Sequence, residues 1–363
     1  MRKILITFSL SLFSLIFISC GEKLDLTEFT NTGRTGTFST DTAYVPINPP
    51  WTGFNNPSDV MVGREPFIYV ADTDNNRVMV LNLAGQKIGT IEVKKPVALA
   101  QDYRLNLFIC AEFDTIINGV QKTFGALYKA DLFAYQHNFS QVKLQRLLPK
   151  TSSDFSKEQR RYTGVAVFYD NSYLVTRTGP DNTSFIDPDN AILEFQQIKN
   201  PDGTIKDSLI GRLPNFEATG SGLMSINELS GITTFNRKTY EIITTQTGNT
   251  NFKVQWLRFI VTNDYAGYVS KFDPEDPRVD ILKIGKFGKP EDVTVDNSNN
   301  VYVIDSEKDS LFKFNQYGTE MHSFGGSNLF KNPKGVAFFD RTLYICDTGN
   351  NRILRFILST DLK

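Results

Sequence analysis

The sequence predicts an all-β protein, a six-bladed β-propeller whose ring is closed by an N-terminal strand in the last blade. The first observation is a unit that occurs three times, at residues 56–93, 289–325 and 332–358. The second is its spacing: Pro290 lies 43 residues before Pro333, within the range of one four-stranded blade. The third is a lone apolar segment at residues 42–47, before the first copy of the unit.

Each copy of the unit consists of short apolar runs separated by turns. In the last copy a Pro-Lys-Gly turn precedes residues 336–338, and a second run, 343–347, ends in Asp. An Asn-rich turn then leads to a third run at 352–356. Val, Ile, Phe and Tyr dominate the runs, as in half-buried strands, and Gly, Asn and Asp in the turns tolerate positive φ.

This pattern resembles the NHL repeat, which implies an NHL-type six-bladed propeller. The three copies match well, and the middle of the chain matches loosely. We expect the propeller to cover residues 42–358, with a C-terminal tail at 359–363. Residues 42–47 should form the outermost strand of the last blade, where Pro46 is tolerated because that strand has one unpaired edge.

The N-terminus is typical of a targeting segment. Arg2 and Lys3 precede an apolar run of about 15 residues, which is short for a membrane span and suitable for a signal peptide. Cys20 after a small residue resembles a bacterial lipobox, although Phe17 stands where that motif usually has Leu. We expect a lipoprotein signal peptide at 1–19, a lipidated Cys20 and a flexible tether to residue 41. The alternative is a plain secretory peptide in which Cys20 is incidental.

Lipidation would place the protein at the bacterial outer membrane or elsewhere in the cell envelope, facing the periplasm or the surface. Charge is balanced, with 39 basic and 40 acidic residues and no basic block, so we expect no nucleic-acid partner. We expect a monomer.

Cys110 and Cys346 occupy equivalent repeat positions, and we expect them to be buried free thiols rather than a disulfide.

The residues that open the innermost strands are the first candidates for chemistry. Glycine is usual there in the repeat that the chain resembles, but blades one and five have Asp59 and Asp292. Two carboxylates near the axis are candidate metal ligands, since Ca²⁺ prefers carboxylate and carbonyl oxygens. The alternative is that each aspartate caps its own turn through backbone N–H groups.

A second acidic set is repeated and therefore indicates structure. Asp72 and Arg77 recur as Asp347 and Arg352, and we expect each pair to join across its Asn-rich turn.

Binding residues are expected on the insertions of blades two to four. The insertions cover residues 112–124, 151–161, 177–190, 215–228 and 246–252. Arg160, Arg161, Arg177 and Phe185 are the candidates in our ligand-binding set, because arginines and aromatics are favoured at interfaces.

Two functions follow from these observations. The resemblance extends to enzymes on related propellers, such as gluconolactonase-like hydrolases and streptogramin-lyase-like enzymes, several of which need histidines. This chain has only His137 and His322, in segments expected to lie away from the axis. The main expectation is therefore a lipid-anchored, non-catalytic binding or scaffold module for an envelope protein or glycan, without a cofactor. The alternative is a Ca²⁺-dependent lactonase- or lyase-like hydrolase with its site at the axis.

Overall fold

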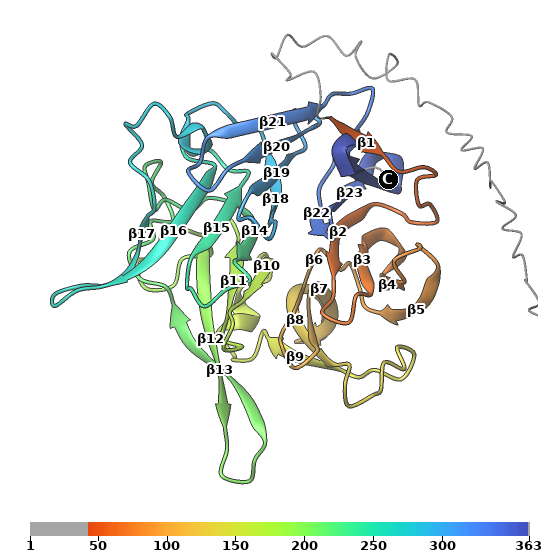
Figure 1. Ribbon diagram of the computed structural model, residues 1–363. Coiled ribbons are helices and arrows are strands. Elements are labelled where there is room, and N and C mark those ends of the chain that lie inside the picture. Colours follow the sequence, from red (N-terminus) through yellow and green to blue (C-terminus); the bar gives the residue numbers. More distant parts are fainter. Residues whose placement is uncertain (1–42, 362–363) are drawn as a thin grey trace, which may run out of the picture. The chain divides into compact units, whose positions relative to one another are not determined.

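A computed structural model describes residues 43–361. These residues form six four-stranded antiparallel sheets around a common axis (Figure 1). Blades one to three contain β2 (Pro57–Val62), β3 (Ile68–Asp72), β4 (Arg77–Leu81), β5 (Lys87–Glu92), β6 (Ala98–Gln101), β7 (Asn106–Ile117), β8 (Val120–Asp131), β9 (Leu144–Leu148), β10 (Arg161–Val167), β11 (Tyr173–Thr178), β12 (Ala191–Lys199) and β13 (Ile205–Arg212).

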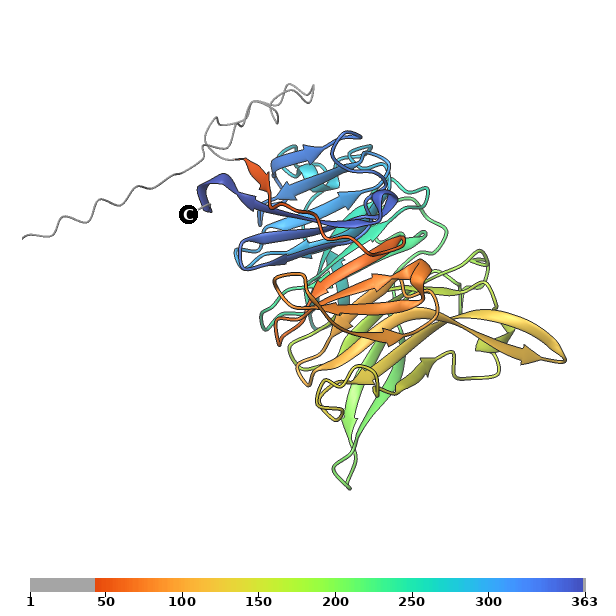
Figure 2. The same cartoon turned by 90° about the vertical axis from the view of Figure 1, so that its right-hand side faces the viewer.

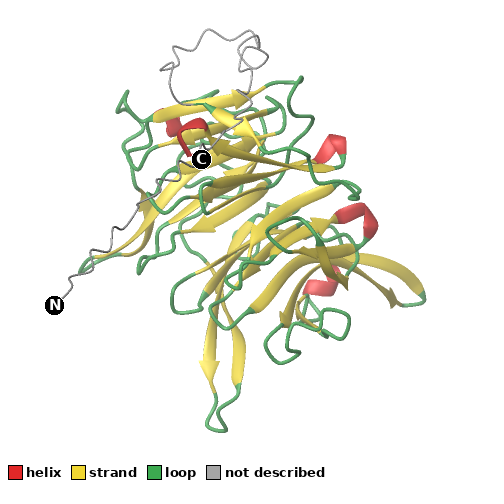
Figure 3. Ribbon diagram, turned by 45° about the vertical axis from the view of Figure 1, so that its right-hand side comes forward, coloured by secondary structure: helices red, strands yellow, loops and turns green. Residues whose placement is uncertain are grey.

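Blades four to six contain β14 (Leu229–Thr234), β15 (Ile242–Gln246), β16 (Val254–Val261), β17 (Ala266–Ser270), β18 (Pro290–Val295), β19 (Val301–Asp305), β20 (Ser310–Phe314), β21 (Glu320–Gly325), β22 (Val336–Phe339), β23 (Thr342–Asp347), β24 (Arg352–Leu358) and β1 (Tyr44–Pro46). The described helices are single 3₁₀ turns (Figure 3): η2 (Thr73–Asn75), η3 (Asp154–Ser156), η4 (Asp280–Leu282), η5 (Thr348–Asn350) and η6 (Ser359–Asp361). None of them is long and apolar enough to cross a membrane.

The N-terminal strand closes the ring, as the sequence predicts. β1 is the outermost strand of the last blade and pairs antiparallel with β24, Val45 lying opposite Ile357. Figure 2 shows β1 beside the C-terminal strands, although more than 300 residues separate the partners. Val45 is 4% exposed, so this pairing also buries apolar surface.

The apolar core is divided between the blade interfaces. Residues 43–361 contain six clusters of buried side chains, one between each pair of neighbouring blades. The cluster between blades six and one joins Cys346 and Ile353 to Val60 and Val70. Cys110 lies in the cluster between blades two and three, and both thiols are free and buried. Each blade is thus stabilised by its neighbours, and closure supplies the sixth interface.

The repeated Asn-rich turns have the predicted ion pairs. Arg77 Nε lies 2.7 Å from Asp72 Oδ2, and Arg352 Nε lies 2.6 Å from Asp347 Oδ2. Both carboxylates have no exposed surface. Asn76, with φ of 52°, supplies the left-handed position that this turn requires.

The first insertion is more regular than the sequence suggests. Residues 112–124 continue β7 and β8 as one long hairpin instead of departing from the sheet. Aromatic packing explains this extension: the ring centroid of Phe155, from the next insertion, lies 5.5 Å from that of Phe124. The Arg146 guanidinium lies 4.1 Å from the centroid of Phe113. These contacts support both strands beyond the body of the blade.

Candidate functional site

A cavity of about 1440 Å³ runs along the axis, lined by the innermost strands of all six blades. We call the face of the ring where these strands begin the start face, and the opposite face the end face. In every blade the first strand runs from the start face to the end face, and the following strands alternate in direction. Turns between first and second strands therefore lie on the end face, whereas turns between second and third strands lie on the start face.

All five insertions lie on the start face. Residues 112–124, 177–190 and 246–252 connect second to third strands, and residues 151–161 and 215–228 connect one blade to the next. Thr178, Gly179, Arg161 and Glu228, from these segments, line the mouth of the cavity on this face. The long loops of blades two to four therefore surround one mouth of the cavity, where a rigid scaffold commonly positions binding residues.

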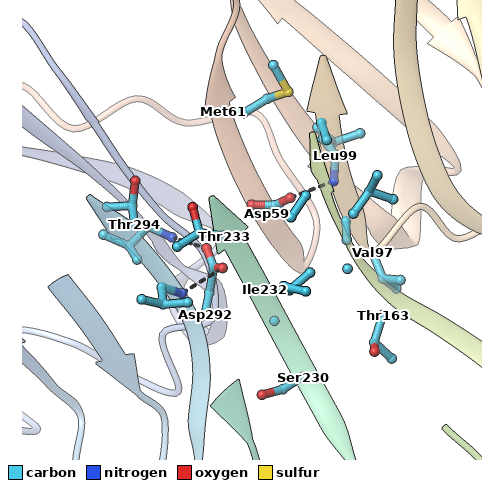
Figure 4. A pocket seen from close by; sticks show the side chains of 18 of the residues that line it. Asp59, Met61, Val97, Leu99, Thr163, Ser230, Ile232, Thr233, Asp292 and Thr294 are labelled. Atoms are coloured by element: carbon cyan, nitrogen blue, oxygen red, sulfur yellow. Dashed lines mark hydrogen bonds between the residues drawn. The ribbon is translucent and has the colours of Figure 1, made fainter. Parts of the chain in front are cut away.

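Asp59 and Asp292 project into the cavity from β2 and β18, near the start face (Figure 4). Asp59 Oδ2 accepts the main-chain N–H of Leu99, in the next blade, at 2.7 Å. Asp292 Oδ2 accepts the N–H of Val336, also in the next blade, at 2.9 Å, and its Oδ1 accepts the N–H of Val293 at 2.7 Å. The carboxylates thus join neighbouring blades, and turn capping within one blade does not describe them.

The environment makes both carboxyl groups weaker acids. Burial raises the pKa of Asp59 from 3.8 to about 6, against the lowering effect of its backbone hydrogen bonds. The pKa of Asp292 is raised well above 3.8, first by burial and then by the negative charge of Asp59. Two acids with different raised pKa values in one cavity are the arrangement from which acid–base pairs are built.

Hydroxyl groups join the blades around the same mouth. Their donors reach carbonyl oxygens at the start of the next blade: Thr73 to Pro96 at 2.7 Å, Thr163 to Leu229 at 2.6 Å, Ser230 to Pro290 at 2.6 Å and Thr348 to Pro57 at 2.7 Å. These residues were missed from the sequence, although a threonine follows the aspartate in both Asn-rich turns. They fix the spacing of the blades on which the two carboxylates stand.

The structure separates the other predicted binding residues. Arg161 lines the cavity, and its Nε lies 3.1 Å from Glu112 Oε1. Arg160 and Arg177 are 5% exposed, and both pair with Asp187 beneath the loop at 177–190. Phe185 is 89% exposed at the tip of this loop and does not line the cavity. The two buried arginines thus hold the loop and present no guanidinium to the cavity. Cys20, the predicted lipidation site, lies outside the described residues.

The donor set does not by itself fit a calcium centre. Calcium takes six to eight oxygen ligands, commonly from several carboxylates and carbonyls. Asp59 and Asp292 supply two carboxylates, three of whose oxygen contacts are main-chain N–H groups. Among the described residues, no group of three or more His, Cys, Asp or Glu side chains can hold a metal. A calcium ion here would therefore need further oxygen ligands besides these two carboxylates.

Comparison with solved structures identifies enzyme-like propellers as similar folds. The chain matches a gluconolactonase from Xanthomonas campestris with a TM-score of 0.52 and 12% identity, over 87% of this chain and 97% of that one. It matches regucalcin from Agrobacterium tumefaciens, described as a calcium-binding protein, with a TM-score of 0.53 and 12% identity, over 85% and 90%.

A third similar structure is an aldose sugar dehydrogenase from Streptomyces coelicolor, with a TM-score of 0.54 and 12% identity, over 88% and 99%. No model of a known protein family and no curated protein matches the sequence. At this identity the likeness shows the six-bladed propeller fold, and the NHL assignment stays a resemblance.

These findings correct the main functional expectation. The sequence favoured a non-catalytic binding or scaffold module, but the propellers named above include enzymes. The expectation rested on the scarcity of histidines. The main expectation is therefore not kept; of the alternative, a Ca²⁺-dependent lactonase- or lyase-like hydrolase with its site at the axis, the comparison supports the enzyme-like propeller fold.

Proposed function

We propose that this protein is a lactonase-like hydrolase that binds a small lactone or related cyclic ester in the axial cavity, with Asp59 and Asp292 as its catalytic residues. The observation that carries the proposal is the placement of both carboxyl groups in one cavity, near the mouth that the insertions surround. The similarity to a gluconolactonase supports the choice of substrate class, and an enzyme has more support here than a binding module.

The chemistry requires one base and one acid. Asp59, with a pKa of about 6, is mostly ionised at neutral pH and accepts a proton from the attacking water. The water oxygen bonds to the carbonyl carbon of the lactone. Asp292, whose pKa is raised well above its ordinary value by burial and by the charge of Asp59, donates its proton to the ring oxygen as the C–O bond breaks. The product is a hydroxy acid, and proton exchange with solvent restores both carboxyl groups.

The backbone contacts orient both carboxyl groups. A base must be oriented before it accepts a proton, and the Leu99 N–H fixes one oxygen of Asp59. The bonds from Val293 and Val336 hold Asp292 in the same way. Neither carboxyl group has to move between blades during the reaction.

A panel of aldono- and alkyl-lactones, assayed by acid release at pH 7.5, tests the proposal. Asp59→Asn and Asp292→Asn should each abolish the hydrolysis that the parent protein shows. Asp340→Asn is the matched control, because Asp340 lines the cavity at its other mouth and should leave the rate unchanged. The proposal is overturned if no lactone is hydrolysed, or if either axial variant retains the parental rate.

The same assay addresses calcium. If added Ca²⁺ restores activity after chelation, and Asp59→Asn abolishes Ca²⁺ binding in calorimetry, the two carboxylates are ligands and the acid–base assignment is wrong. We expect chelator to leave the rate unchanged.

We also propose that Cys20 anchors the enzyme to the bacterial envelope, since the segment before it has the features of a lipoprotein signal.

A further inference from the structure

We propose that Tyr103 bars the end-face mouth of the cavity, so that the cavity has one working entrance, on the start face, and accepts compact molecules rather than a threaded chain. This inference rests on the proposed function only for the identity of the ligand. The claim about the entrance rests on the contacts of Tyr103.

The first argument is that the Tyr103 side chain spans a blade. It follows β6 of blade two, and its hydroxyl donates to Asn236 Oδ1 of blade four at 2.9 Å. The side chain of Asn171, in blade three between them, accepts the main-chain N–H of Tyr103 at 2.8 Å. The other hydrogen bonds described between blades for residues 43–361 join neighbours. A bond that skips a blade requires the phenol to cross part of the mouth.

The second argument is that a cation supports the ring. The guanidinium carbon of Arg64, in the first turn of blade one, lies 3.3 Å from the centroid of Tyr103. The turn that carries Arg64 is itself held, because the main-chain N–H of Arg64 donates to Gln101 Oε1 at 2.7 Å. Gln101 Nε2 donates in turn to Glu65 Oε1 at 2.9 Å. The turns of blades one to four therefore all contribute to the position of Tyr103. Its ring is held by Arg64 and its hydroxyl by Asn236.

The third argument is the contrast with the start face. Hydroxyl bonds on that face run only between neighbouring blades and leave the mouth uncrossed. Val97, at the start of its blade, lines the cavity at this mouth. The insertions also rise around this mouth, where both catalytic carboxyl groups lie. The open mouth and the two carboxyl groups thus lie at the start face, whereas Tyr103 crosses the mouth at the end face.

The consequence concerns the size of the substrate. A polymer that passes through the ring would have to displace Tyr103 from Asn236 and Arg64. A compact lactone can enter and its hydroxy acid can leave by the start face without disturbing the bar. Tyr103 would then limit how far a ligand extends beyond the carboxyl groups, which makes it a residue that determines specificity.

Thiol labelling tests the bar without a substrate. Thr294→Cys places a reporter on the cavity wall near the end face, and Val97→Cys places a matched reporter at the start face. The probe is a maleimide coupled to a bulky fluorescent dye. Cys110 and Cys346 have no exposed surface, and burial raises the pKa of both thiols, so they should label slowly. Both reporters are placed in a Cys20→Ser background, and the remaining labelling is measured without a reporter.

Adding Tyr103→Ala should speed labelling at position 294 several-fold and leave the rate at position 97 unchanged. Tyr103→Phe, which keeps the ring over Arg64 but loses the bond to Asn236, should give an intermediate rate; it also serves if the alanine variant fails to fold. Equal rates at position 294 in all three proteins, or equal acceleration at both reporters, would overturn the proposal. Because labelling needs no turnover, a negative result here is distinct from failure of the lactone assay.

Discussion

The Asp292 carboxylate and the main-chain N–H of Val336 form a hydrogen bond of 2.9 Å across the boundary between blades five and six. Asp59 and Leu99 make the corresponding link between blades one and two. Each aspartate thus has two roles, since it joins two blades and also presents a carboxyl group to the cavity. Replacing either residue should affect stability and activity in opposite directions.

We predict that Asp59→Asn is more stable than the parent protein at neutral pH. The folded protein keeps the proton of Asp59 up to a pH of about 6, whereas the unfolded chain releases it near 3.8. The stability that this proton confers is therefore lost as the pH rises from about 4 to about 6. The shift of about two units corresponds to about 3 kcal/mol, and the amide avoids this loss while its oxygen still accepts the Leu99 N–H.

Urea unfolding of both proteins at several pH values from 4 to 8 checks this prediction. The difference in unfolding free energy should grow in favour of the variant with rising pH and level off above about pH 7. A variant that is less stable than the parent at pH 8 would contradict the prediction that the ionised Asp59 destabilises the folded protein.

The pH dependence of kcat/KM for lactone hydrolysis should be bell-shaped. The rate rises with pH as Asp59 loses its proton, through a pKa of about 6, because the base must be ionised. It falls at higher pH, where Asp292 loses the proton that the leaving oxygen needs. Initial rates at substrate concentrations below KM measure both limbs, and a rate independent of pH between 5 and 7 would contradict the role given to Asp59.

Arg77→Ala should destabilise the protein by about 3 kcal/mol, because it leaves the fully buried Asp72 carboxylate without its cation. Arg278→Ala is the matched control: Arg278 also pairs with an aspartate, at 2.8 Å, but is 83% exposed. Its loss should change stability little, because solvent screens an exposed pair. Thermal unfolding compares the two variants, and equal shifts in Tm would mean that burial does not govern the strength of these turns.

Gly335→Ala should weaken the contact between blades six and one. A Cβ at this position would lie 2.7 Å from Asp59 Cα and 3.0 Å from Ser58 O, which are backbone atoms that cannot rotate away. The strands must separate, at a cost of about 1–3 kcal/mol, and Asp59 moves with them. Gly222→Ala is the control, since no atom lies within 4 Å of its added Cβ. Chemical denaturation and the lactone assay should both detect the first change and not the second.

Cys20 should carry lipid in cells. Metabolic labelling with an alkynyl fatty acid should mark the mature protein, and Cys20→Ser should abolish the label and release the protein from the membrane fraction. Equal labelling of both proteins would contradict lipidation at this cysteine. If the signal is instead a plain secretory peptide, the parent protein will be cleaved but unlabelled.

The sequence by itself determined the periodic features. Repeated Asn-rich turns, a spacing of one blade and a spare strand at residues 42–47 were enough to predict six blades, closure by β1 and the pairs Asp72–Arg77 and Asp347–Arg352. These features are local or recur in several blades, so each copy supports the others. Asp59 and Asp292 were found for the same reason, because they interrupt a pattern that the repeat defines.

The tertiary structure decided which side chains meet across the ring. Arg161 reaches the cavity whereas its neighbour Arg160 is buried against Asp189, a difference that composition does not show. Tyr103 and Asn236 lie 133 residues apart on single, unrepeated turns, and only closure of the ring brings them within 2.9 Å. The raised pKa values of the two aspartates likewise arise from burial and, for Asp292, also from the charge of Asp59, which act only once the blades are assembled.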